Sequence, residues 1–477
     1  MKISILRRAI AYVAALLVTS AFLVANLAGI AKAQSKTNDL GILARSSNSS
    51  VKPESSKVSR TIELYFDPLQ GASSIDLVQR ALTSNLELAA ARLEISRARA
   101  RLRQAGLRPN PSLDVEHTTG GLTGSAGERE TSIGVSLPLE VAGQRRRRID
   151  VAQAQLEATE AEVAERERRL ASEVFAAYAE ALSALRELEI TEGLDEIDLQ
   201  TTRFVQARVN EGESAPIELS LLQVEVDRLK SRRALVEGRL QASLLRLKNL
   251  AGIPFNEPLR LREDLSTSQE QWQRPVSVDA AIEIAMRTRP DLKLAQLNLE
   301  VARAGLNLAR SQSAPEIVAS AKYIQNRSIF NETPVGPISD RDKLLIFGVS
   351  VGIPVFNRNQ GAKAEAAIAI SQAERREEFL QTVVRSEVAS AYARVEAVQK
   401  SLTLFDQGVI GRSNDNIRAI RAAYQLGEFK ITDLLAEQRR LLDSQREFTE
   451  ALAERYRALA DLRTAIGAPP AGNESQQ

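Results

Sequence analysis

An internal duplication constrains this chain more than any other feature of its sequence. Four short segments of the first half recur in the second half in the same order. For the last three the offset stays at about 215 residues (427 minus 212, for example). A unit of this size is far longer than a solenoid repeat, so we expect one protomer built from two equivalent halves. The matched pairs are Ser74-Ile75-Asp76 with Ser277-Val278-Asp279, Ser172-Glu173-Val174 and Tyr178 with Ser386-Glu387-Val388 and Tyr392, Gly212-Glu213 with Gly427-Glu428, and Gly252-Ile253-Pro254 with Gly467-Ala468-Pro469.

The remaining segments are set by composition. The N-terminus has a basic start, a long apolar stretch and Ala31-Lys32-Ala33, an A-x-A motif typical of signal peptide cleavage. We therefore expect cleavage after Ala33 rather than an uncleaved membrane anchor. The segment that follows is rich in Ser, Asn and Lys, which favours a flexible leader. The predicted segments are a signal peptide (1–33), a leader (34–73), a first repeat (74–254), a second repeat (276–469) and a C-terminal tail (470–477).

Composition excludes several classes of function. The chain has no cysteine and one histidine, His117, so thiolate chemistry and soft-metal sites are not expected, and neither is a cofactor. The 63 basic and 61 acidic residues balance to a net charge of +2. Because no single charge sign dominates, nucleic acid is not an expected partner.

Helical sequence dominates both repeats. Residues 145–209 lack proline, and residues 360–425 are interrupted only by Gly408 and Gly411 after their start. Apolar residues recur every three to four positions, which predicts long coiled-coil-like helices of about 95 Å each. Gly212 and Gly427 then mark the turns where one long helix gives way to the next.

Each repeat also contains a pair of alternating segments, which predict β-hairpins. The clearest strands are residues 131–139 and 347–355, and their partners are residues 112–118 and 316–325. The polar, glycine-rich residues 119–129 and 326–342 are the expected hairpin loops. By strand parity, Asp114, Glu116 and Lys322 lie on the polar face.

Strands of about ten residues with one apolar face fit the wall of a transmembrane barrel. Four strands cannot close a barrel, and open edges are not tolerated in lipid, so the protomer would have to oligomerise. The alternative is a pair of half-buried hairpins packed on a helical domain. The expected fold class is mainly α with a membrane β-barrel.

One segment of the sequence matches a motif of hydrolytic enzymes. Gly348-Val349-Ser350-Val351-Gly352 matches the G-x-S-x-G nucleophile pattern. That motif requires a sharp strand-to-helix turn and a later histidine base. Here Ser350 lies within a predicted strand and His117 precedes it, so we expect no catalytic residues and no enzyme activity.

With these elements in order, the chain resembles TolC-family outer-membrane efflux proteins, most of all the CzcC/CusC-like branch. The resemblance rests on the strand-to-helix junctions and the helical tips, and it covers residues 74–469. The residues that carry it are Leu137-Pro138-Leu139, Gly143-Gln144-Arg145, residues 353–359 (IPVFNRN), residues 208–213 (RVNEGE) and residues 423–428 (AYQLGE).

The resemblance implies a homotrimer with a twelve-stranded barrel in the bacterial outer membrane and a helical tunnel in the periplasm. It implies passive conduction of substrates that an inner-membrane pump, of the RND type or another, delivers through a periplasmic adaptor (membrane fusion) protein. Asp114, Glu116 and Lys322 would then face the barrel lumen. The implied adaptor contacts are Glu211, Gly212, Leu426, Gly427 and Glu428.

The resemblance also implies a periplasmic aperture lined by acidic residues just past the second tip. Asp433 falls on one acidic position, whereas the second carries Ala436 with Glu437 beside it. Asp433 and Glu437 are one turn apart and form either a carboxylate ring in a trimer or an ordinary solvated face. Glu218 lies where the acidic partner of the family's inter-helix lock is expected, but Phe429 replaces the locking arginine.

Two other functions remain open at this stage. A periplasmic helical-hairpin adaptor or scaffold would use the long helices for binding, and a structural coiled-coil protein of the envelope would conduct nothing. The duplicated pair of amphipathic strands favours the channel over both.

Overall fold

The computed structural model describes residues 58–120, 128–266, 275–330 and 338–468. The chain divides into two units, residues 1–54 and 55–477, and every described residue belongs to the second. The predicted signal peptide, most of the predicted leader and the C-terminal tail lie outside the described residues. Within these ranges, no helix is both long and apolar enough to cross a lipid bilayer.

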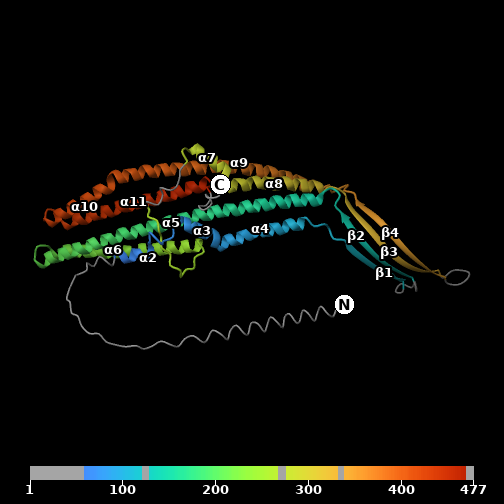
Figure 1. The fold of residues 1–477 in the computed structure, drawn as a ribbon, viewed down its shortest axis with the longest axis horizontal. Coiled ribbons are helices and arrows are strands. Elements are labelled where there is room, and N and C mark those ends of the chain that lie inside the picture. The colour runs from blue at the N-terminus through green and yellow to red at the C-terminus, as the bar shows by residue number, and fades with distance from the viewer. Residues whose placement is uncertain (1–57, 121–127, 267–274, 331–337, 469–477) are drawn as a thin grey trace, which may run out of the picture. The chain divides into compact units, whose positions relative to one another are not determined.

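The two repeats build the same series of elements, and the predicted mainly helical fold is confirmed (Figure 1). A short helix, α2 (Val58–Tyr65), comes first. The first repeat contains α3 (Ser74–Ser84), α4 (Leu86–Ala105), β1 (Ser112–Thr119), β2 (Arg129–Leu139), α5 (Gln144–Asn210) and α6 (Pro216–Leu250). The second contains α7 (Val278–Thr288), α8 (Pro290–Ser311), β3 (Glu316–Phe330), β4 (Ile338–Gly352), α9 (Gln360–Leu404), the π-helix η3 (Phe405–Val409), α10 (Ile410–Gln425) and α11 (Ile431–Ala465).

Equivalent caps fix the short helices of the two repeats. The side chain of Ser73 accepts from the third backbone N–H of α3, and Ser277 does the same for α7. The structure therefore pairs Ser277 with Ser73, one residue earlier than the Ser74 match suggested by sequence. Asn85 Nδ2 donates to the Leu250 carbonyl at the end of α6, and Arg289 NH1 donates to the Ala465 carbonyl at the end of α11.

The π-helix η3 accounts for a one-residue difference between the repeats. The offset is 214 residues at Ser172 and Ser386 (386 minus 172), and 215 at Gly212 and Gly427 (427 minus 212). The second repeat thus carries one additional residue in this interval, where η3 lies. A single inserted residue widens one helical turn into a π-bulge, so the long helix continues through the insertion.

The prediction of a flexible leader is wrong for residues 58–73. Residues 58–73 contain α2, and Phe66 and Ala72 form bridges with Leu261. Ile62, Tyr65 and Phe66 pack against the main hydrophobic core. Burial of these apolar side chains offsets the entropy lost when the segment becomes ordered. The prediction of flexibility came from the polar residues that precede this segment.

All four strands form one antiparallel sheet in the order β1-β2-β3-β4. The predicted strands are confirmed, except that β4 ends at Gly352 and not at residue 355. At the hairpin end β3 and β4 extend further than expected, because their pairing continues from Gln325↔Lys343 to Phe330↔Ile338. The predicted loop at residues 326–342 is therefore mostly strand. Backbone pairing extends past the alternating residues because a hydrogen-bonded ladder does not require an apolar face.

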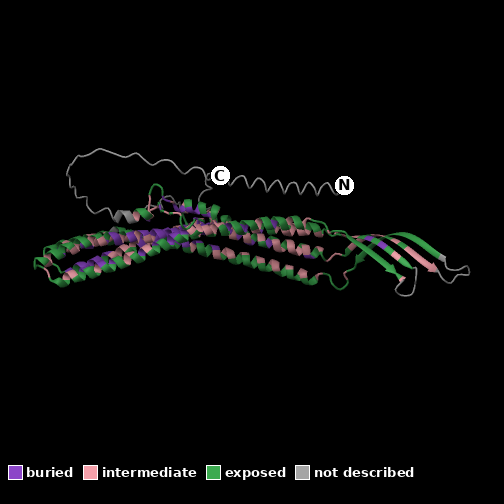
Figure 2. Cartoon of the chain, turned by 90° about the horizontal axis from the view of Figure 1, so that it is seen from below, coloured by how far each residue is buried: buried purple, intermediate pink, exposed green. Residues whose placement is uncertain are grey.

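A buried joint connects the two repeats. The hydroxyl of Tyr178 on α5 donates to the Ala72 carbonyl (3.0 Å) and accepts from the Glu263 N–H (3.3 Å). Its ring lies 6.1 Å from that of Tyr456 on α11. In Figure 2 the buried residues gather along the middle of the long helices, where this joint lies. The equivalent Tyr392 donates to the Val276 carbonyl (3.3 Å).

Tyr178 and Tyr392 therefore allow a matched test of the joint. Tyr178→Phe leaves the Ala72 carbonyl and the Glu263 N–H without the hydroxyl, so we expect a loss of about 1–3 kcal/mol in free energy of unfolding. Tyr392→Phe should cost about 1 kcal/mol or less, because the 3.3 Å bond that it removes is long and its acceptor is the carbonyl of an exposed residue, Val276. Chemical denaturation of the purified protein measures both, and equal losses would contradict the assigned role of the joint.

Candidate functional site: the sheet and the helical tips

One face of the sheet is apolar and exposed across all four strands. Register places Leu113, Val135, Ala321 and Phe347 in one row, and the next row contains Val115, Ile133, Tyr323 and Leu345. Leu113, Val115, Leu345, Phe347 and Val349 are between 62 and 77% exposed. A face this apolar and this open marks a surface that contacts lipid or another protein.

The opposite face carries the three predicted lumen residues. Asp114, Gly134 and Lys322 share one row, and Glu116 lies in the next. Lys322 Nζ lies 2.7 Å from Glu116 Oε2, and Ser132 Oγ donates to the same oxygen at 3.3 Å. The structure therefore brings these charged groups together on the face opposite the apolar side chains, as parity predicts.

The sheet also explains the G-x-S-x-G match. Ser350 pairs with Val318 within the β3–β4 ladder, so it lies in extended strand and not at the sharp turn that a nucleophile elbow requires.

The helical tips end in paired glycine turns. Gly212 and Gly427 have φ angles of 78° and 80°, and a Cβ at either position would meet nothing within 4 Å. Glycine is favoured there by the left-handed backbone rather than by lack of space. Glu213 N donates to the Arg208 carbonyl (2.8 Å), and Glu428 N donates to the Ala423 carbonyl (2.9 Å).

The predicted adaptor-contact residues occupy these turns. Glu211 caps the end of α5, and Leu426 caps the end of α10 with its side chain 76% exposed. Glu428 follows in the second turn and is also exposed. These side chains are thus available to a partner.

A hydrogen bond ties the two tips together. Tyr424 on α10 donates its hydroxyl to Glu218 Oε2 on α6 at 3.1 Å. Burial, with the Glu218 carboxylate beside it, raises the pKa of Tyr424 to about 12, so the hydroxyl remains a donor at neutral pH. Tyr424 also belongs to a hydrophobic cluster that joins both hairpins, together with Val205, Leu222, Ile417, Ile431, Leu434, Leu435 and Leu441.

Sequence reasoning identified Glu218 but missed Tyr424 as its partner. It expected the partner at the position of Phe429, whereas the structure leaves Phe429 46% exposed. The available signal was a tyrosine one turn before the tip glycine.

The two aperture candidates occupy different environments. Asp433 is exposed, and its carboxylate accepts from the Lys430 N–H at 3.1 Å at the start of α11. Glu437 is only 5% exposed and pairs with Arg440 at 3.2 Å. Within one protomer, Asp433 is therefore the more accessible carboxylate of the two.

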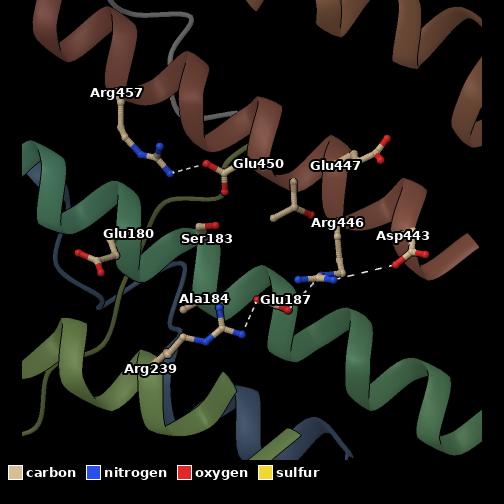
Figure 3. A pocket seen from close by; sticks show the side chains of 11 residues that line it. Glu180, Ser183, Ala184, Glu187, Arg239, Asp443, Arg446, Glu447, Glu450 and Arg457 are labelled. Atoms are coloured by element: carbon tan, nitrogen blue, oxygen red, sulfur yellow. Dashed lines mark hydrogen bonds and ion pairs between the residues drawn. The ribbon is translucent and has the colours of Figure 1, made fainter. Parts of the chain in front are cut away.

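A groove between α5, α6 and α11 holds a charge network (Figure 3). Its volume is about 570 Å³. The Glu187 carboxylate lies at its centre and pairs with Arg232 (2.7 Å) and Arg239 (3.0 Å) from α6 and with Arg446 (3.4 Å) from α11. These pairs connect the two hairpins. Among the residues with described positions, no group of three or more potential ligands is arranged to hold a metal ion.

Comparison with known proteins agrees with this architecture. The profile of the family described as outer membrane efflux protein matches residues 77–253 and 281–468. The cobalt-zinc-cadmium resistance protein CzcC of Cupriavidus metallidurans is 22% identical over 395 residues, which cover 81% of this chain and 88% of that protein. The pyoverdine export outer membrane protein OpmQ of Pseudomonas aeruginosa is 25% identical over 423 residues, covering 83% and 85%.

A solved structure shows the same fold. The crystal structure of CusC superposes with a TM-score of 0.70 at 22% identity, over 85% of this chain and 96% of that one. The resemblance to the TolC family and its CzcC/CusC-like branch is thereby confirmed. The two matched segments of the family profile correspond to the two repeats and together span most of the sequence, so this chain belongs to the outer membrane efflux protein family.

Proposed function

We propose that this chain is the outer-membrane exit duct of a tripartite efflux system. The observation that carries the proposal is the sheet, because β1 to β3 carry charged groups on the face opposite an exposed apolar face. A lipid-facing barrel wall around a polar lumen needs this division. Family membership supports the same reading.

The strand pairing supports a homotrimer. Within the described part of the chain, β1 and β4 each pair on one side only. Unpaired backbone groups at a sheet edge are costly in lipid, so β4 of one copy would pair with β1 of the next. Three copies would supply about twelve strands, enough to enclose a water-filled lumen. Asp114, Glu116 and Lys322 would line it.

The long helices would form the periplasmic part of the duct. α5 contains 67 residues and is therefore about 100 Å long. Its far end carries the tips, where Glu211, Leu426 and Glu428 would contact a periplasmic adaptor that links the duct to an inner-membrane pump. The energy for transport would come from that pump.

The runner-up function is a periplasmic adaptor or scaffold. It accounts for the long helices and the exposed tips. It leaves the apolar face of the sheet without a partner, which is why we favour the duct.

Adjacent residues on opposite faces of β4 test the membrane assignment. Val349→Arg would place a charge in lipid at a cost of about 2–4 kcal/mol, so we expect loss of assembled oligomer in outer-membrane fractions. Ser350→Arg should assemble and change single-channel conductance in planar bilayers. Equal assembly of the two variants, or a water-soluble wild-type monomer without conductance, would contradict the duct.

The tie between the tips predicts a gating variant. Tyr424→Phe removes a hydrogen bond to a charged acceptor, worth about 1.5–3 kcal/mol, and should raise the open probability in bilayers. Tyr65→Phe is a matched control, because the Tyr65 hydroxyl also donates to a glutamate, Glu237, at 3.1 Å but joins α2 to α6 rather than one hairpin to the other. The same change in both variants would argue against a tie specific to the tips.

The aperture hypothesis predicts unequal effects for its two carboxylates. If three exposed Asp433 side chains converge, Asp433→Ala should reduce cation selectivity, measured as a shift in reversal potential under a salt gradient. Glu437→Ala should change selectivity less, because Glu437 is buried and paired with Arg440. Unchanged selectivity in Asp433→Ala would favour the solvated-face alternative.

A further inference from the structure

A buried carboxylate lies between the two helical hairpins. Asp198 on α5 is 2% exposed, and Gln438 on α11 is 7% exposed. Gln438 Nε2 donates to Asp198 Oδ1 at 2.7 Å. One residue belongs to each repeat, so this hydrogen bond crosses from the first hairpin to the second.

The surroundings of Asp198 disfavour its charge. Burial is the largest cause that raises the pKa of Asp198, to about 6, and the nearby carboxylates of Asp195 on α5 and Glu225 on α6 act in the same direction. The Gln438 amide and Arg421 on α10 act against them. Glu225 is itself paired with Arg439 on α11 at 2.8 Å, which limits its effect.

The facing amide can serve either protonation state. Gln438 Oε1 is buried, and among the described residues it has no hydrogen-bond partner. An ionised Asp198 accepts from Nε2, whereas a protonated Asp198 can donate to Oε1 after rotation of the amide. The second arrangement exchanges the bond of the amide N–H for one to the buried oxygen and removes a buried charge, which is favourable in a poorly hydrated interface.

We propose that Asp198 is a proton-binding site between the two hairpins, and that binding a proton stabilises their packed arrangement relative to a separated one. This inference goes beyond the proposed function, since it concerns two hairpins within one chain. In a duct that opens by separating its hairpins, a lower pH would therefore favour the closed state.

The direction of the effect follows from linkage. In separated hairpins Asp198 meets water, and its pKa returns towards the ordinary value of 3.8. The additional stability of the packed arrangement is therefore complete below that value and is lost as the pH rises through about 6. A difference of roughly two pH units corresponds to a shift of up to about a hundredfold in the packing equilibrium.

The absence of cysteine in the sequence allows a clean distance measurement. Ala207 on α5 and Ala422 on α10 occupy equivalent, exposed positions one turn before the two tips. The full-length double variant Ala207→Cys/Ala422→Cys would be spin-labelled, diluted with unlabelled chain and examined in detergent by pulsed electron resonance between about pH 5 and about pH 8. We expect the packed population, which has the short distance, to increase as the pH falls. The midpoint of this change should lie near the pKa of Asp198.

Three substitutions in this background complete the test. Asp198→Asn imitates the protonated carboxyl and should hold the packed population high at every pH. Gln438→Leu removes a hydrogen bond that is stronger to the ionised carboxylate than to the neutral acid, so it should move the midpoint to higher pH. This variant keeps the test decisive if the first variant fails to fold. Asp227→Asn alters an exposed carboxylate on α6, which pairs with Lys230 in its own helix, and should behave as wild type.

The proposal and the exit-duct function can fail separately. A wild-type distance distribution that does not change with pH, or an Asp198→Asn variant that keeps the wild-type dependence, would overturn the proton site whatever the conductance. A pH-dependent distance in a protein that never conducts would retain the site and count against the duct.

Discussion

The arrangement of both repeats depends on one partly buried carboxylate, that of Glu263. It accepts hydrogen bonds from the backbone N–H (2.9 Å) and hydroxyl (3.0 Å) of Ser74, and from the Tyr456 hydroxyl at 3.4 Å. Its own N–H donates to Tyr178. Burial raises the pKa of Glu263, and these donors oppose that rise by stabilising the ionised form. A linker residue thereby fixes α5 of one repeat against α11 of the other, and the long helices transmit this register to the sheet at one end and the tips at the other.

The duplication provides the scaffold, and function arises where the repeats differ. Glu218 and Asp433 are equivalent, since 433 minus 218 equals the 215-residue offset of the tip glycines. Both are the third residue of their helix, yet Glu218 accepts from Tyr424, whereas Asp433 accepts from its own N-cap backbone. The position equivalent to Tyr424 is Val209, which has no hydroxyl to donate. One tip can therefore hold the other without a reciprocal bond.

Local patterns predicted the elements, and long-range contacts could not be predicted in the same way. The alternation of Phe347, Val349 and Val351 identified β4, and the glycine turns identified the tips, because each depends on residues close in sequence. The extension of β4 to Ile338 depends on backbone pairing with β3, which its polar residues do not signal. The bond from Tyr424 to Glu218 joins residues 206 apart, and that from Gln438 to Asp198 joins residues 240 apart. Such pairs depend on how the helices of the two hairpins are aligned along one another. That alignment is determined by the joint between α5 and α11, which forms only in the folded protein.

The polar contacts between the hairpins suit the proposed duct, which would open at its tips without unfolding. An apolar cluster at the tips favours packing at every pH, whereas the Tyr424–Glu218 bond contributes on the order of 1.5–3 kcal/mol and requires one specific geometry. A partner can reverse an equilibrium of this size with a differential affinity of a few kcal/mol for the separated tips. The Glu263 joint lies in the central core, remote from the tip cluster, so the hairpins can part while the repeats remain joined. Separation of the strong joint from the weak tie would allow the proposed duct to have a gate at the end of a long helix.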